Sequence, residues 1–321
     1  MSDLIRSLLL LQLALPLVLI LANGLLPFAS RLGFVLRSLA IAGLLIYLAL
    51  AGLWLFPPFW TPHALGLLHV VLCLWRYHRQ RQGGASPRRA LRFGELALSL
   101  AALGGALALL VPVIDGRRAP DLAIDLAQPL GPGRYLVVSG GATLAVNAHL
   151  RTLDLPRAAD FRGQSYAVDI IGIDRIGRRS SGIQPPDPSA YVIQGRPVLA
   201  PCAGQVIGLT SGVPDNRVPE MARDPMTGNS VILNCDGLAV VLAHFRAGSV
   251  VVALGDRVEP GQRLADVGNS GNSGEPHLHL HVQTLADPAR PLSGAPLFFS
   301  VEGNFLRRND RLFVKGTLEG Q

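Results

Sequence analysis

The first third of the chain contains long stretches without a single charged residue. Asp, Glu, Lys and Arg are absent from residues 7–30, 38–75 and 96–114. A helix needs roughly 20 apolar residues to cross a bilayer. The middle stretch is long enough for two helices, and Pro57-Pro58 would break it between them. We therefore predict an all-α transmembrane region of four helices, with spans at about 7–28, 37–56, 60–76 and 94–114.

The arginines between the apolar stretches predict an orientation. Arg31 and Arg37 lie in the first connection, six arginines lie between residues 76 and 92, and the FPPFWTP connection has no charge. Arginine-rich loops stay on the cytoplasmic side of a membrane. Both termini are then outside the cytoplasm, and the protein is expected to be multi-pass in the cytoplasmic (inner) membrane. A signal peptide is the alternative for residues 1–30, but its apolar region would be too long.

Composition changes near residue 115, which predicts a boundary between residues 1–115 and residues 116–321. The first 114 residues carry nine arginines and two acidic residues, whereas the remainder carries twenty basic and twenty acidic residues. The isoelectric point near 10.0 therefore reflects arginines beside the apolar spans. The neutral second part gives no indication of a nucleic-acid partner.

The second part is expected to be mainly antiparallel β-structure. Short runs rich in β-branched residues alternate with Gly, Pro, Asn and Asp, a pattern typical of strands joined by turns. No helix longer than a turn or two is expected there. The predicted strands are residues 134–140, 142–150, 165–173, 204–209, 230–237, 239–245 and 249–254.

Three histidines alternate near the end of this part, in GNSGNSGEPHLHLHVQ (268–283). On a strand His277, His279 and His281 share one face, while the residues between them point into the core. Two imidazoles at this spacing can bind one zinc ion. The solvated face of an ordinary strand would show the same pattern, so the alternation alone leaves both interpretations open.

The surrounding sequence resembles the lysostaphin/LytM-type zinc metallopeptidases. The segment AHFRAGSVVVALGDRVEPGQRLADVGNSGNSGEPHLHLHV (243–282) fits their C-terminal signature, and RPVLAPCAGQVIG (196–208) is similar to an upstream strand-turn-strand motif. The resemblance covers about residues 145–285. It implies a β-domain of the lysostaphin/LytM-like, duplicated hybrid motif type with one zinc ion per chain.

The resemblance also implies roles for individual residues. His279 and Asp169, the latter in YAVDI, match zinc ligands. His277 and His244 match the two catalytic histidines. No HExxH motif is present, so these two histidines would handle the protons of the reaction, which suits a side chain that titrates near neutrality.

The third ligand departs from the usual spacing. In the family's common pattern it is a histidine four residues before the aspartate, but here that position is Ser165. His149, in the strand-like NAHL twenty residues before Asp169, is the nearest upstream candidate. A β-hairpin with a long insertion (151–164) would bring it alongside Asp169. A packing role is the alternative for His149.

Several further residues are candidates for supporting roles. His281 would lie about 13 Å from His277 along the strand, which favours a supporting or groove position over a fourth ligand. Tyr166 and Asn147 lie near the proposed ligands in the sequence and could orient them. Cys202 and Cys235 are candidates for a disulfide, which an extracytoplasmic location permits.

The resemblance implies a membrane-anchored zinc endopeptidase that hydrolyses the peptide cross-links of peptidoglycan. The expected partners are peptidoglycan peptides, while any membrane-protein partners of the helices stay unidentified. One alternative is a catalytically silent domain that binds wall peptides or regulates a partner hydrolase. Another is a channel or transporter with a sensor domain, against which the scarcity of charged residues in the spans argues.

Overall fold

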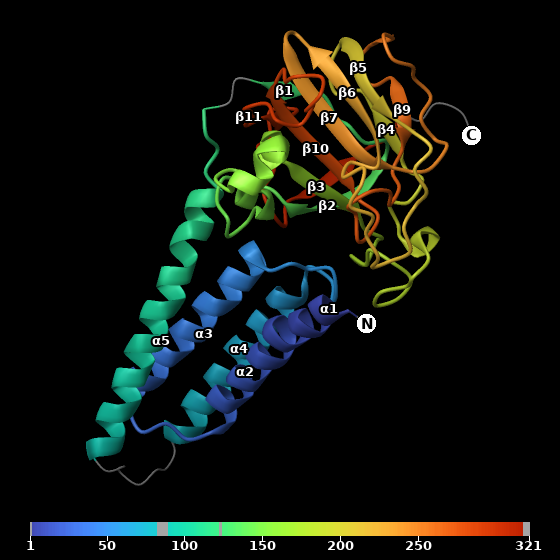
Figure 1. The fold of residues 1–321 in the computed structure, drawn as a ribbon. Coiled ribbons are helices and arrows are strands. Elements are labelled where there is room, and N and C mark those ends of the chain that lie inside the picture. Colours follow the sequence, from blue (N-terminus) through green and yellow to red (C-terminus); the bar gives the residue numbers. More distant parts are fainter. Residues whose placement is uncertain (1, 82–88, 122–123, 317–321) are drawn as a thin grey trace. The chain divides into compact units, whose positions relative to one another are not determined.

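The computed structural model describes residues 2–81, 89–121 and 124–316. The chain divides into two compact units, Met1–Asp115 and Gly116–Gln321. The first unit is helical and the second is built on β-sheet (Figure 1).

The helical unit consists of apolar helices joined by short connections. Ser2 and Ser30 accept hydrogen bonds from the backbone N–H groups of Ile5 and Gly33, and so cap the helices that follow them. The elements are α1 (Asp3–Leu8), the π-helical segment η1 (Leu9–Ala14), α2 (Leu15–Leu25), α3 (Arg31–Ala51), α4 (Thr61–Arg81) and α5 (Arg89–Gly116).

Three helices of this unit are long and apolar enough to cross a membrane, judged by length and composition within the described residues. They are Asp3–Leu25, Arg31–Ala51 and Leu91–Gly116. The span predicted at about 60–76 is not confirmed. Its segment forms the 21-residue helix α4, but that helix contains His63 and His69 and ends in RYHRQR. These polar residues reduce its hydropathy below that of a spanning helix.

An ion pair lies among the helices of this unit. The Nη1 of Arg37 in α3 is 3.1 Å from the Oε1 of Glu95 in α5, and Arg37 Nε donates to Asn23 Oδ1 at 2.6 Å. Glu95 Oε2 accepts hydrogen bonds from the backbone N–H groups of Ala29 and Ser30. Glu95 thus neutralises Arg37 and satisfies backbone donors in front of α3.

The second unit is built around a nine-stranded sheet in which every pairing is antiparallel, which confirms the predicted mainly antiparallel class. Its order is β13-β2-β3-β10-β7-β6-β5-β8, and β11 pairs with β10. Two smaller pairings, β1 with β12 and β4 with β9, complete the unit. The strands are β1 (Asp125–Leu126), β2 (Gly133–Ser139), β3 (Val168–Gly172), β4 (Pro197–Leu199), β5 (Gly204–Thr210), β6 (Asn229–Cys235), β7 (Leu238–Phe245), β8 (Arg257–Val258), β9 (Arg263–Asp266), β10 (Leu278–Thr284), β11 (Pro296–Leu297), β12 (Ser300–Val301) and β13 (Arg311–Val314).

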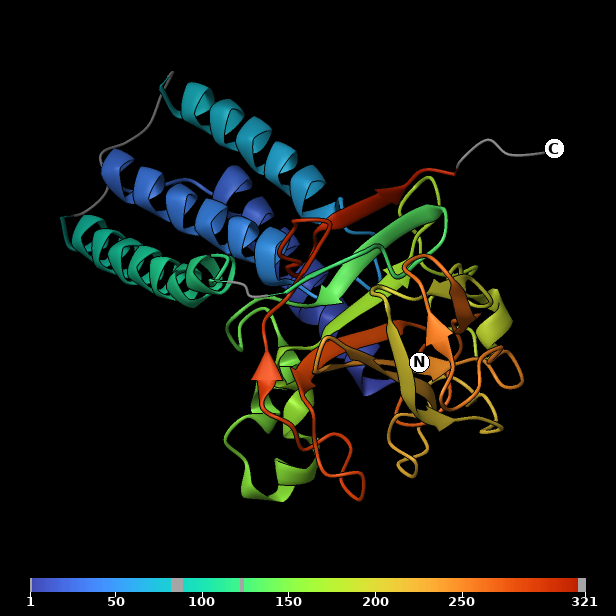
Figure 2. The ribbon, with the colours of Figure 1, turned by 90° about the horizontal axis from the view of Figure 1, so that it is seen from above.

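The two faces of the sheet differ in chemistry. Leu278, Leu280 and Val282 of β10 point into the main hydrophobic core and are completely buried. The alternate residues His279 and His281 occupy the opposite face, as strand geometry requires. The 3₁₀ helix η3 (Pro156–Tyr166) lies beside β10 on this second face (Figures 1 and 2).

Two predicted strands and the expected scarcity of helix were wrong. Residues 142–150 form turns followed by the 3₁₀ helix η2 (Ala148–Thr152). The Asn147 side chain donates to the backbone carbonyls of Gly141 and Ala167 and accepts from the His149 N–H, so local bonds replace strand pairing. The inserted residues that follow form η3, which begins at Pro156. Residues 249–254 are also not a strand.

Candidate metal centre

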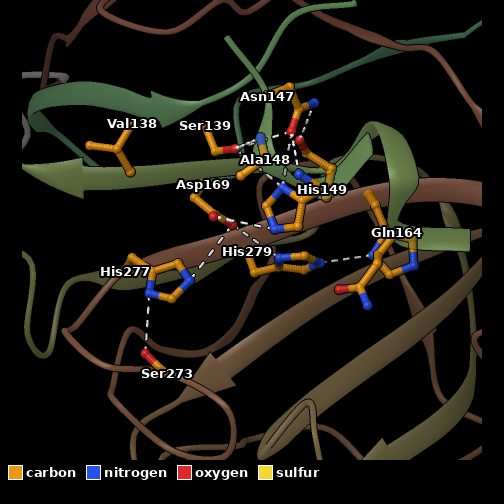
Figure 3. A network of polar contacts seen from close by, with 12 residues as sticks. Val138, Ser139, Asn147, Ala148, His149, Gln164, Asp169, Ser273, His277 and His279 are labelled. Carbon is orange, nitrogen blue, oxygen red and sulfur yellow. Dashed lines mark hydrogen bonds and ion pairs between the residues drawn. The ribbon is translucent and has the colours of Figure 1, made fainter. Parts of the chain in front are cut away.

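The centre of the site is formed by two neighbouring strands. Asp169 on β3 is directly opposite His279 on β10 in the sheet register. The Asp169 Oδ1 lies 3.0 Å from the His279 Nδ1 (Figure 3). Because backbone pairing sets this register, the carboxylate and the imidazole are held together on the rigid part of the unit.

His149 approaches the same carboxylate from η2. Its Nε2 lies 3.4 Å from Asp169 Oδ2. Its other ring nitrogen, Nδ1, lies 3.1 Å from Asn147 Oδ1 and 3.3 Å from Ser139 Oγ. The Asn147 oxygen therefore accepts the Nδ1 proton, and the Nε2 lone pair is directed toward Asp169.

The ligating atoms of His149, Asp169 and His279 all lie within 4.8 Å of one another. Two imidazoles and one carboxylate are a donor set that zinc prefers, and three protein ligands leave a fourth position open. The donor chemistry and the spacing therefore fit a metal ion. Figure 3 shows the three side chains converging on one point from three different elements.

His281 supports His279 from behind. The His281 Nδ1 lies 3.0 Å from the His279 Nε2, and His281 is 1% exposed. If the Nδ1 of His279 binds a metal, its Nε2 carries the proton and donates it to His281. Such an outer hydrogen bond fixes the tautomer and orientation of a ligating histidine.

A bulge directs His244 into the site. In the pairing of β6 with β7, Asn229 is opposite Phe245 and Ser230 is opposite Ala243, so His244 is the extra residue. Its φ of 67° lies in the left-handed region that side chains other than glycine seldom adopt. The bulge reverses the alternation, so that His244 shares a face with its neighbour Ala243. Its Nδ1 then donates to the Ser270 carbonyl at 2.9 Å.

His277 is the last of the five site residues predicted from the sequence. Its Nδ1 donates to the Glu275 carbonyl at 2.8 Å and also lies 3.1 Å from Ser273 Oγ. Its Nε2 lies 3.6 Å from Asp169 Oδ1. The His277 ring centroid is 4.8 Å from that of His244.

The five residues line one cavity of about 320 Å³. Thr227, Asn272 and Gln164 supply polar groups to the same walls. Two imidazoles with available Nε2 atoms thus lie next to a three-ligand metal position. This arrangement can bind a metal ion and transfer protons beside it.

Burial and charge set the protonation states in the cavity. Burial lowers the pKa of His149 to about 4, although the Asp169 charge opposes the shift. Burial also lowers the pKa values of His244 and His281 well below the usual value. Burial alone would raise the pKa of Asp169, but His149 and His277 outweigh it and keep that pKa far below its usual range. Neutral histidines and an ionised carboxylate are the forms that bind metal.

The other residues predicted from the sequence lie in different parts of the second unit. Asn147 contacts His149, as described above. Tyr166 stacks its ring on Phe298, with ring centroids 3.7 Å apart, and is not among the described residues that line the cavity. Cys202 and Cys235 form a disulfide whose Cα atoms are 6.1 Å apart.

Sequence reasoning missed Ser139 and Glu275, which also anchor histidines of the site. Ser139 reaches His149 because a register shift in β2 falls between Val137 and Ser139. Glu275, whose carbonyl holds His277, forms a two-point ion pair with the buried Arg179 at 2.6 and 2.8 Å. The Gly-Asn-Ser pattern around Ser273 was the one signal that could have suggested such anchoring.

One protein-family model matches part of the second unit. Residues 190–291 match the family model described as Peptidase family M23. This part of the chain is similar to the peptidases of family M23. The matched stretch includes His244, His277 and His279, whereas His149 and Asp169 lie upstream of it and meet these histidines only through the fold.

One relative matches part of the chain at low sequence identity. The cell division protein DipM of Caulobacter vibrioides is 29% identical over 132 residues, which is 40% of this chain and 19% of DipM. The chain thus matches about a fifth of the length of that relative.

Solved structures give only a weak likeness. A zinc-containing peptidase from Vibrio cholerae is 18% identical over 49% of this chain and 37% of that chain, with a TM-score of 0.28. The catalytic domain of lysostaphin from Staphylococcus simulans is 18% identical over 52% of this chain and 84% of that chain, with a TM-score of 0.26. TM-scores this low carry no weight for fold or function.

Proposed function

We propose that the protein is a membrane-anchored zinc endopeptidase that hydrolyses the peptide cross-links of peptidoglycan. The observation that carries the proposal is the convergence of His149, Asp169 and His279 beside the Nε2 atoms of His244 and His277. A domain that only bound wall peptides would not need two further imidazoles directed at a three-ligand position.

The proposed metal site consists of His149 Nε2, an Asp169 oxygen and His279 Nδ1. Zinc, when bound there, would polarise the scissile carbonyl and lower the pKa of water toward about 7. The chain contributes the imidazoles of His244 and His277 on the open side of this position. One imidazole takes the proton of the attacking water on its Nε2. The other, in its protonated form, donates a hydrogen bond from its Nε2 to the carbonyl oxygen on which negative charge develops.

The helices support a place at the membrane. We infer that residues 1–115 anchor the protein in the cytoplasmic membrane and that residues 116–321 form the extracytoplasmic peptidase domain. The six arginines between residues 76 and 92, directly before the last apolar helix, are consistent with residues 116–321 lying outside the cytoplasm. That side is also where peptidoglycan lies.

The test is cleavage of purified cross-linked muropeptides by the full-length, zinc-loaded protein in detergent. We expect the intact protein to release the separated stem peptides, and His277→Ala to reduce the rate by about 100-fold or more while retaining zinc. His78→Ala, an exposed histidine of α4, is the matched control. Full zinc occupancy without any cleavage would refute the enzyme proposal and favour a silent, peptide-binding domain.

A further inference from the structure

A second cavity lies in the β-unit outside the metal site. It has a volume of about 700 Å³ and shares no lining residue with the histidine cavity. Its walls come from the loops around residues 186–195 and 215–217 and from Arg246, which directly follows β7. The charged members of the lining are Asp187, Asp215, Arg217 and Arg246.

The two carboxylates of this cavity already have hydrogen-bond partners. Asp187 Oδ1 accepts from the Ser189 N–H at 2.8 Å, where it caps a short 3₁₀ turn. Asp215 Oδ1 accepts from the Asn269 N–H at 2.7 Å, and its Oδ2 accepts from Gln194 Nε2 at 3.3 Å. Both carboxylates therefore already accept hydrogen bonds from the protein around the cavity.

The guanidinium groups of Arg217 and Arg246 differ from these carboxylates in their hydrogen bonding. Among the described residues, neither Arg217 nor Arg246 has a side-chain hydrogen bond or an ion pair. Both side chains are exposed. A guanidinium group carries five N–H donors in a planar fork that matches a carboxylate. The cavity thus presents unused cationic donors to an anionic ligand.

This cavity is connected to the reacting groups by a short piece of backbone. Arg246 is two residues beyond His244, and two residues of extended chain span at most about 7 Å. The Gly268 N–H donates to the His244 carbonyl at 3.0 Å. The next residue, Asn269, is the one held by Asp215. The cavity wall and the backbone that holds His244 are therefore one connected structure.

We propose that Arg217 and Arg246 form a subsite for a free carboxylate of the peptide substrate, a few residues from the scissile bond. This inference rests on the proposed peptidase function and identifies the chemical group that the enzyme selects. A carboxylate bound between the two guanidinium groups would fix the register of an extended peptide across His244 and the metal position. A substrate whose carboxylate is amidated would lose these charge-assisted bonds.

The test compares two cross-linked peptides that differ only in a free carboxylate or a carboxamide. Binding is measured by calorimetry on the full-length, zinc-loaded protein carrying His277→Ala, which removes turnover from every arm. We expect the free acid to bind about tenfold more tightly than the amide, as one charge-assisted hydrogen bond would give. The double change Arg217→Gln and Arg246→Gln should reduce this preference to less than twofold.

Arg257→Gln is the matched control, because Arg257 in β8 is exposed and does not line the cavity. Each single glutamine variant is measured as well, so that a folding defect of the double variant cannot decide the result. The subsite would be overturned if acid and amide bound equally or if neither bound. It would also be overturned if the preference survived the double change, or if inorganic phosphate competed equally strongly. Muropeptide cleavage by the unmodified protein is a separate measurement, so failure of the subsite and failure of the peptidase proposal are distinguishable.

Discussion

Asp169 and His279 are 110 residues apart in the sequence and directly opposite each other in the sheet, with 3.0 Å between Oδ1 and Nδ1. Two backbone ladders hold this pair, because β10 is hydrogen-bonded to β3 on one side and to β7 on the other. His149 has no such support and depends on the bonds made by Asn147 and Ser139. The metal site therefore has two rigid ligands and one that is anchored locally.

Replacing Asn147 with alanine should weaken metal binding. The Asn147 oxygen accepts from both the backbone N–H and the ring of His149, and the side chain is completely buried. Loss of such an outer contact typically costs about 10- to 100-fold in metal affinity. Competition with a zinc chelator measures the change, and Asn304→Ala, at an exposed turn, is the control. An unchanged affinity would show that Asn147 does not orient the ligand.

The ion pair behind His277 should be important for stability. Arg179 is 3% exposed at its side chain, so Glu275→Ala leaves a buried guanidinium group without its carboxylate. We expect a loss of about 3–5 kcal/mol in the free energy of unfolding, measured by denaturant titration. Arg178→Gln, which breaks the more exposed pair with Asp174, should cost less than about 1 kcal/mol. Similar losses for the two variants would contradict the account.

The pairing of β1 with β12 should respond to acid. The Ser300 hydroxyl and the Gly303 N–H donate to Asp125 and lower the pKa of its carboxyl below the usual value. A lowered folded-state pKa adds stability above the unfolded value of about 3.9, and that stability disappears as the pH falls through the folded value. Thermal unfolding should therefore show Asp125→Asn less stable than the parent at pH 7, with the gap closing below about pH 4.

Asp121→Asn is the control for this pH series, because the Asp121 carboxylate has no hydrogen bond or ion pair to any described residue. Its stability should follow the parent at every pH. A gap for Asp125→Asn that persists unchanged at pH 2–3 would rule out the carboxylate as its source.

The disulfide should stabilise the β-unit. Cys202 and Cys235 enclose a separation of 33 residues, and closing a loop of that length contributes about 3–4 kcal/mol in the chain-entropy estimate. The double change to serine should lower the melting temperature, and a reductant should lower that of the parent but not of the variant. A parent protein that is unaffected by complete reduction would contradict this role.

Much of the β-unit could be predicted from its sequence because strand periodicity and motif spacing are local. The alternation at His277, His279 and His281 predicted that alternate residues of this segment share one face, and the antiparallel class followed from the short apolar runs. The place of His149 could be proposed only by elimination. Its backbone is a 3₁₀ turn stabilised by Asn147, and no periodic pattern distinguishes that turn from a strand.

Other features depend on contacts that single-sequence patterns do not contain. The bulge at His244 and the register shift in β2 before Ser139 arise from the pairing of distant segments. Arg179 and Glu275 are 96 residues apart, and neither carries a local signal of the ion pair. The span predicted at about 60–76 is not confirmed, because this apolar run is of marginal length and its helix continues into a basic end.

The central claim is that His149 completes a three-ligand zinc site with Asp169 and His279. Metal content of the full-length protein, measured by mass spectrometry after dialysis against micromolar zinc, tests it directly. We expect about one zinc per chain in the parent and in His78→Ala, and strongly reduced zinc in His149→Ala, Asp169→Ala and His279→Ala, with each variant still folded by circular dichroism. Full zinc content in His149→Ala would contradict the account.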